Sequence, residues 1–238
     1  MRRINYSLLL LALLLSTACS QQPTAIKPAT ATDSVSIGTN AAALPKVAKS
    51  LPGSEQQQFT QAKQLMQQQD FDNAAELLQN IVASQADFAG VWYNLAVCQW
   101  QLNQAGEAES SLQQALVADA KSASLNQSAG LNLSASLNQN GSLNKSASLN
   151  LLGILAREQG QFGQAEQYWL QAVQANDTAA AHKNLGILYE LYLGQLNQAQ
   201  RHYQRYFELS QDPQAKMWLT LIDRQLAAQG SSDAEESL

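Results

Sequence analysis

Val91-Trp92-Tyr93-Asn94-Leu95-Ala96 and Ala181-His182-Lys183-Asn184-Leu185-Gly186 are two versions of one sequence pattern, and this pattern decides the fold. In both, an asparagine and a leucine precede a small residue. Four segments align on the pattern with a period of about 34 residues, which is typical of arrays of helical hairpins. The segments are 55–88, 89–122, 146–179 and 179–213.

The second half of each segment follows a pattern of its own. Gly160-Gln161-Phe162-Gly163-Gln164-Ala165-Glu166 begins the second helix expected in the third segment, and Asp70-Phe71-Asp72-Asn73-Ala74 does so in the first. Small residues recur at fixed places, where two antiparallel helices can approach closely, and large residues at helical spacing fill the space between hairpins. The small residues are Ala74, Ala96, Ala108, Gly153, Ala165, Gly186 and Ala199.

Together the two patterns resemble the tetratricopeptide repeat. The resemblance implies an all-α solenoid of about four helical hairpins, with repeats 1 and 2 in residues 55–122 and repeats 3 and 4 in residues 146–213. The turn of the fourth repeat, 191–194, has one extra residue. Apolar residues continue at helical spacing after Pro213, so we expect a capping helix over 214–229 and a disordered tail over 230–238.

The N-terminus is typical of an export signal followed by a tether. Arg2 and Arg3 precede an apolar run over 8–15, and small polar residues then lead to Cys19. The run is shorter than the roughly 20 residues that a membrane-spanning helix needs. Residues 21–52 are rich in Ala, Thr, Ser and Pro, hold four of the five prolines and show little apolar periodicity. Residues 19–54 are therefore predicted to form a flexible tether.

Residues 15–19, Leu-Ser-Thr-Ala-Cys, resemble the lipobox of bacterial lipoproteins, although Ser16 stands where that family usually has leucine. The resemblance implies removal of the signal peptide, residues 1–18, and attachment of diacylglycerol to Cys19, which becomes the acylated first residue. Ser20 follows the cysteine. In Gram-negative members of the family, this implies sorting to the outer membrane, facing the periplasm. An ordinary secreted protein is the alternative.

Five hexapeptides in register separate the second repeat from the third. They begin at Ser122, Ser128, Ser134, Asn140 and Ser146, and the last is also the start of the third repeat. Removing four copies would shorten the Ala96 to Gly153 spacing from 57 to 33, which equals the Gly153 to Gly186 spacing. We therefore interpret 123–145 as a tandem expansion of a helix start. Successive leucines would point about 240° apart on an α-helix, so a mobile loop, an extension of the flanking helices and a β-coil stay open as alternatives.

Composition and motifs exclude several function classes. Without residues 1–18 the chain has 12 basic and 19 acidic side chains, a formal charge of −7, which disfavours nucleic acid as a partner. Cys98 lies in an apolar helical pattern, so we expect a buried core residue. His182 and His202 lack metal-ligand spacing, and no nucleophile, zinc or phosphate-loop motif occurs. We therefore expect no enzyme activity, no cofactor and no metal.

Stacked tetratricopeptide hairpins curve so that their first helices line a concave groove. The groove-facing positions of the family, carried onto this chain, predict twelve partner-binding residues. They are Phe59, Lys63, Met66, Tyr93, Val97, Trp100, Ile154, Arg157, Glu158, Lys183, Ile187 and Glu190. Apolar side chains beside Arg157 and Lys183 suit an amphipathic peptide with apolar anchors and an occasional carboxylate. The alternative for each residue is packing against the next helix.

The architecture resembles that of tetratricopeptide lipoproteins that act in pilus or secretin assembly. This resemblance implies an outer-membrane scaffold that binds partner proteins or peptides, and it rests on architecture alone. An adaptor that tethers peptidoglycan enzymes is a second binding role. Glycan processing is the enzymatic alternative, and it would need a pair of carboxylates converging in a pocket.

Overall fold

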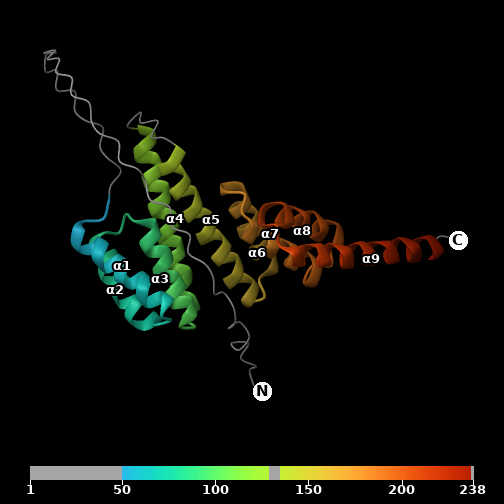
Figure 1. Cartoon of the computed structure of the whole chain (residues 1–238), viewed down its shortest axis with the longest axis horizontal. Helices are drawn as coiled ribbons and strands as arrows, with labels where there is room; N and C mark the ends of the chain where they lie inside the picture. Colours follow the sequence, from blue (N-terminus) through green and yellow to red (C-terminus); the bar gives the residue numbers. More distant parts are fainter. Residues whose placement is uncertain (1–49, 129–134, 237–238) are drawn as a thin grey trace, which may run out of the picture. The chain divides into compact units, whose positions relative to one another are not determined.

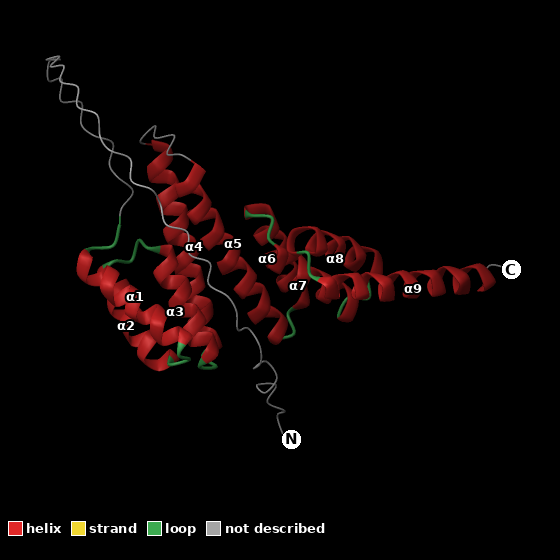
Figure 2. Ribbon diagram, viewed as in Figure 1, coloured by secondary structure: helices red, strands yellow, loops and turns green. Residues whose placement is uncertain are grey.

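Helical hairpins form wherever the repeat pattern predicts them. The computed structural model describes residues 50–128 and 135–236, with side chains described for 50–124 and 144–229. These ranges contain nine α-helices and no strand, so the predicted all-α solenoid is confirmed (Figures 1 and 2). The helices are α1 (Gly53–Gln67), α2 (Phe71–Ser84), α3 (Ala89–Gln101), α4 (Ala105–Ser128), α5 (Ala135–Glu158), α6 (Phe162–Ala175), α7 (Ala179–Leu191), α8 (Leu196–Ser210) and α9 (Pro213–Glu236). Repeats 1 to 4 are the hairpins α1/α2, α3/α4, α5/α6 and α7/α8.

A residue in the left-handed region lies in the turn of every hairpin. These residues are Gln69, Asn103, Gly160 and Gly194, with φ values of 62°, 61°, 77° and 64°. The sequence separation from Gln69 to Asn103 equals that from Gly160 to Gly194, whereas the separation from Asn103 to Gly160 is longer. The backbone therefore shows both the repeat period and its interruption. Glycine adopts this conformation without strain, and asparagine tolerates it better than most residues. In the fourth turn the amide of Gln195 donates to the Tyr189 carbonyl, one residue further back than the equivalent bond from Asp70 to Leu65, which accounts for the extra residue.

Two glycines let the helices of the third and fourth hairpins approach closely. A Cβ atom on Gly153 would lie 2.4 Å from Nε1 of Trp169, and one on Gly186 would lie 2.5 Å from Cε1 of Tyr203. Both aromatic side chains are buried. Trp169 Nε1 also donates to the Asn150 carbonyl over 3.0 Å, which fixes the indole against α5. The small residues predicted from the pattern therefore make room for the aromatic rings of the second helices.

The core is continuous across the interruption between repeats 2 and 3. Ala96 and Leu112 of the second hairpin share one apolar cluster with Leu152 and Leu155 of the third. Helix α5 contacts both α3 and α4. The two pairs of repeats therefore dock against each other, which gives the stack one continuous core.

The interruption itself lengthens two helices. Both α4 and α5 have 24 residues, whereas the other helices of the hairpins have 13 to 15. Residues 122–128 belong to α4 and residues 135–146 to α5. Of the three conformations left open by the sequence, the described parts of the tract adopt the extension of the flanking helices. The mobile-loop alternative is therefore wrong for these parts, and residues 129–134 lie outside the described structure.

The last helix packs against α8 and extends past the predicted cap. Ala215 and Ile222 are buried, and Trp218, Leu219 and Leu226 are packed against the same C-terminal apolar cluster. The helix continues to Glu236, beyond the boundary at residue 229 expected from the sequence. The predicted signal peptide, Cys19 and the tether up to residue 49 lie outside the described residues. Within the described ranges, no helix combines the length and the hydropathy needed to cross a membrane.

Candidate partner-binding surface

The first helices of the hairpins form a row. Helix α3 contacts α1 and α5, and α5 in turn contacts α7 (Figure 1). The twelve residues predicted to bind a partner are carried by this row. Lys63 and Glu158 are exposed, the other ten are half-buried, and none is fully buried in the core. That these side chains together form a binding groove stays a prediction.

The middle of the row brings five of the predicted residues together. Nε1 of Trp100 on α3 donates to Oε2 of Glu158 on α5 over 3.2 Å, although the two residues are 58 positions apart. Tyr93, Val97 and Ile154 pack with Trp100 on the apolar cluster between repeats 2 and 3. Burial raises the pKa of the Tyr93 hydroxyl, which stays neutral. An apolar stripe with a polar edge therefore crosses from α3 to α5 where the sequence is interrupted.

The first repeat contributes a smaller part of the surface. Phe59 and Met66 are partly buried against the N-terminal apolar cluster. Lys63 is exposed, and its Nζ lies 5.1 Å from the ring centroid of Phe59. A cation over an aromatic face is stabilised by about 0.5–1 kcal/mol at an exposed site. The Lys63 ammonium group therefore lies at the surface, above an apolar base.

The charged residues predicted on α7 have partners inside the molecule. Nζ of Lys183 lies 5.6 Å from the ring centroid of Tyr206 and 5.4 Å from that of Trp218. Glu190 accepts a hydrogen bond from the hydroxyl of Tyr203 over 2.7 Å. Desolvation, followed by this carboxylate, raises the pKa of the Tyr203 hydroxyl. Both charged side chains, Lys183 and Glu190, are thus in contact with residues of the next helices, which is the packing alternative. Ile187 packs on the same C-terminal cluster.

An asparagine pair on the row was not singled out from the sequence. Nδ2 of Asn184 on α7 donates to Oδ1 of Asn150 on α5 over 2.8 Å. Both side chains are half-buried. Asn184 belongs to the repeated motif itself, so its place was available in the sequence. Its partner was not, because Asn150 does not occupy the equivalent place in the third repeat.

A histidine pair joins α7 and α8. The Nδ1 atoms of His182 and His202 lie 2.9 Å apart, and Nε2 of His182 lies 2.7 Å from Oδ1 of Asp177. Arg205 pairs with the other oxygen of Asp177. Burial, and then the charges of His182 and Arg201, lower the pKa of His202 to about 4. In the described ranges, no group of three or more histidine, cysteine, aspartate or glutamate side chains could hold a metal ion.

Two further titratable groups are buried in the stack. Cys98 is fully buried, as predicted, and burial raises the pKa of its thiol to about 11. Such a thiol stays protonated and unreactive at neutral pH. On α4, burial raises the pKa of Asp119 to about 7 against the opposing charge of Lys145. Its Oδ2 atom is buried and has no hydrogen-bond partner within the described part of the chain.

Comparison with protein families supports the repeat assignment. Models of the tetratricopeptide repeat match residues 65–128 and residues 150–191. The first match ends within the hexapeptide tract and the second begins after it, so both halves of the stack contain tetratricopeptide repeats, as the sequence pattern predicts. No curated protein matches the chain.

Solved structures share the fold at low sequence identity. That of Pseudomonas aeruginosa pilF is 16% identical with a TM-score of 0.58, covering 74% of this chain and 70% of that one. BtubC from P. vanneervenii is 18% identical with a TM-score of 0.55, covering 75% of each chain. MamA is 16% identical with a TM-score of 0.51, covering 66% of this chain and 78% of that one. Tetratricopeptide repeats are in general non-catalytic scaffolds, and the fold is consistent with a role in protein–protein interaction.

Proposed function

We propose that this chain is a scaffold anchored by lipid to the outer membrane, facing the periplasm, and that its row of first helices binds a partner protein or peptide. One observation carries the binding role: Tyr93, Val97, Trp100 and Ile154 form a half-buried apolar stripe that crosses from α3 to α5. Binding surfaces are enriched in aromatic residues that are packed on one side and open on the other.

The chemistry of the stripe selects an amphipathic ligand. Apolar anchors of the partner would contact Trp100 and Ile154, as helices and extended peptides do in apolar grooves. The charges of Lys183 and Glu190 are engaged within the molecule. Carboxylates of the partner would therefore approach Arg157 on α5 or Lys63 on α1.

The membrane anchor is supported by the lipobox-like sequence that ends at Cys19. Assembly of a pilus or secretin is the process that we propose for the scaffold, because the architecture resembles tetratricopeptide lipoproteins with that role. The shared fold with Pseudomonas aeruginosa pilF is compatible with this proposal. A lipid anchor at the outer membrane would hold the binding row beside components that oligomerise there.

Affinity capture of the full chain from detergent-solubilised envelopes tests the binding proposal. Trp100→Ala removes the largest side chain of the stripe, and loss of an aromatic anchor typically weakens binding by about 2 kcal/mol or more, roughly thirty-fold. Leu170→Ala is the matched control, because Leu170 is 44% exposed on α6, outside the row. We expect secretin or pilin components with the wild type and the control, and their loss with Trp100→Ala.

Other outcomes separate the parts of the proposal. Capture of peptidoglycan hydrolases instead would reassign the pathway to the tethering of cell-wall enzymes. Equal capture by the wild type and Trp100→Ala would show that the row is not the binding surface. For the anchor, Cys19→Ser should move the chain out of the outer-membrane fraction. A variant that still fractionates with this membrane would refute the lipid attachment.

A further inference from the structure

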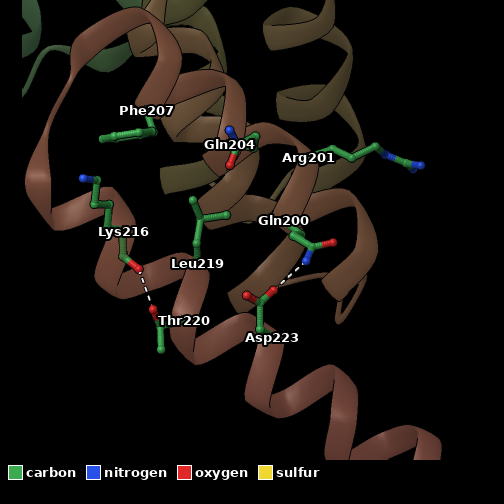
Figure 3. Close-up of a pocket in the computed structure, with 8 residues that line it drawn as sticks. All are labelled: Gln200, Arg201, Gln204, Phe207, Lys216, Leu219, Thr220 and Asp223. Atoms are coloured by element: carbon green, nitrogen blue, oxygen red, sulfur yellow. Dashed lines mark hydrogen bonds between the residues drawn. The ribbon is translucent and has the colours of Figure 1, made fainter.

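A hollow at the C-terminal end of the stack is not filled by any described helix. It is an open cavity of about 670 Å³ between α8 and α9 (Figure 3). Phe207 and Leu219 give it an apolar base, and Nζ of Lys216 lies 5.0 Å from the Phe207 ring centroid. Further along α9, Asp223 accepts a hydrogen bond from Nε2 of Gln200 over 2.6 Å. The cavity therefore has an apolar base, with a cation at the end formed by the start of α9.

The repeat pattern indicates what would fit this place. Ala215, Leu219 and Ile222 of α9 stand one repeat period after Ala181, Leu185 and Leu188 of α7. Helix α9 thus occupies the place of the first helix of a fifth hairpin. In the preceding repeats, the second helix of a hairpin packs into the corresponding groove. The second helix α6, for example, packs there through Tyr168, in one cluster with Leu112 of α4 and Leu155 of α5. The cavity between α8 and α9 is accordingly the place that the second helix of a fifth hairpin would take, antiparallel to α9.

The side chain of Thr220 restricts which helices can pack into the cavity. Thr220 stands one repeat period after Gly186, the glycine that makes room for Tyr203 in the fourth hairpin. With threonine in this place, close approach requires a small residue on the incoming helix. The second half of α9 offers such residues. Ala227, Gly230, Ser231 and Ala234 continue, at helical spacing, the stripe of Lys216, Leu219, Thr220 and Asp223.

The charges of α9 indicate the same kind of incoming helix. Its last turns contain Asp233, Glu235 and Glu236 and no basic residue. Carboxylates at a helix C-terminus are unfavourable, because this end of the helix dipole is negative. Lys216 lies near the N-terminus of the same helix, where the dipole is positive. An antiparallel second α9 would bring the acidic turns of each helix to the cationic end of the other.

The middle of α9 is exposed beyond the C-terminal apolar cluster. Among the described side chains, Leu226 is the last of the helix to pack against this cluster, and residues 227–229 are exposed. Figure 1 shows α9 continuing from α8 to the C-terminal end. Isolated helical segments shorter than about 12 residues are marginal in water. A partner along this part of α9 would stabilise it.

We propose that a second copy of this chain fills the cavity, with α9 of each copy packed antiparallel in the α8/α9 groove of the other. A two-fold axis near Gln225 pairs Lys216 with Ala234, Leu219 with Ser231, and Thr220 with Gly230. Each copy supplies the other with the second helix of a fifth hairpin, so the contact closes as a dimer. This interface lies outside the binding row on α1, α3, α5 and α7.

A charge exchange tests the interface in the full chain. Two differently tagged copies are produced in the same cells, solubilised in detergent and captured through one tag. Lys216→Glu places a carboxylate opposite the acidic turns, and Asp233→Lys with Glu235→Lys places basic turns opposite Lys216. Each variant should therefore lose at least about tenfold of its self-capture. A mixed pair, one copy of each kind, has complementary charges at both contacts and should recover wild-type capture.

Two controls on α9 make the result specific. Arg224→Glu reverses a charge outside the cavity lining and should leave self-capture unchanged. Gly230→Leu places a large side chain against Thr220 and should abolish it, whereas Gln229→Leu, one residue away, should not. Circular dichroism of each variant checks that the helices are retained. Absence of self-capture by the wild type, equal effects of Lys216→Glu and Arg224→Glu, or failure of the mixed pair to recover would each overturn the dimer.

Discussion

Close contact between the helices of the third and fourth hairpins depends on the absence of a Cβ atom at two glycines. A Cβ on Gly153 would lie 2.4 Å from Nε1 of Trp169, whose side chain is fully buried. We expect Gly153→Ala to lower the free energy of unfolding by about 1–3 kcal/mol through overpacking, in spite of the better helix propensity of alanine. Urea denaturation followed by far-UV circular dichroism measures the change.

Gly163 provides the matched control for this prediction. It also lies in a helix of the third hairpin, but a Cβ there would meet nothing within 4 Å. Gly163→Ala should therefore leave stability unchanged or raise it by at most about 1 kcal/mol. Equal destabilisation by both substitutions would show that the contact with Trp169 does not explain the effect.

Two half-buried titratable groups, His202 and Asp119, act on stability in opposite directions. The pKa of His202 falls from 6.5 to about 4 on folding, so the unfolded chain binds more protons and this residue makes stability rise with pH between these values. The pKa of Asp119 rises from 3.8 to about 7, so the folded chain binds more protons and this residue makes stability fall with pH over its own range. In the wild type the two contributions offset each other from about pH 4 to 6.5.

Removing either group should reveal the other. For His202→Gln, the urea midpoint should fall as the pH rises from 4.5 to 6.5. For Asp119→Asn the midpoint should rise over the same interval. This variant keeps His202, which makes stability rise with pH, and has no carboxylate at residue 119 to offset it. Parallel pH profiles for the two variants would contradict this assignment of the charges.

The histidine pair shows where prediction from residue spacing ends. His182 and His202 stand on different helices, so nothing in a linear pattern indicates that their rings meet. The contact follows from how α7 packs on α8, which depends on Gly186 and Tyr203. By contrast, burial of Cys98 could be predicted, because apolar periodicity alone identifies the inner face of a helix.

Among the elements, the lengthened pair α4 and α5 tests whether the hexapeptide tract matters to the fold. Deleting 122–145 joins Lys121 to Ser146 and restores the regular spacing of the small residues. The new connection would then resemble the short loops that join α2 to α3 and α6 to α7. We expect folding to persist with one cooperative unfolding transition. Loss of cooperativity in the deletion variant would show that the extended helices are required.

The conformation of the tract could not be predicted from its sequence. A six-residue period on an α-helix spreads the leucines around the helix, so no single apolar face indicates what they pack against. The extension arises from its context: α4 and α5 are already helical on either side, and adding residues to a helix avoids a new nucleation step. The hairpins themselves could be predicted, because their small residues repeat at the spacing of the fold.

For the whole molecule, the order of the repeats could be predicted but the distribution of charges on the binding row could not. Lys183 is turned toward Tyr206 and Trp218 because α9 completes the end of the stack beside it. A position in a repeat motif does not contain this information, since it depends on the next element. Trp100 and Glu158 meet for a related reason, namely that repeats 2 and 3 dock across the tract.

We expect this docking to make the stack unfold as one cooperative unit, and its central contact can be weakened. Stability of a solenoid is approximately the sum of its repeats and of the interfaces between neighbours. Leu155 is 2% exposed in the cluster that joins repeats 2 and 3. Leu155→Ala should cost about 2–5 kcal/mol and uncouple the halves. In native-state hydrogen exchange, amides of α1–α4 and of α6–α9 should then open with different free energies.

Leu78→Ala, within the N-terminal cluster, removes a fully buried side chain of the same size but leaves this contact intact, so both halves should still open together. Uniform exchange in Leu155→Ala would mean that the halves are coupled through contacts other than this cluster.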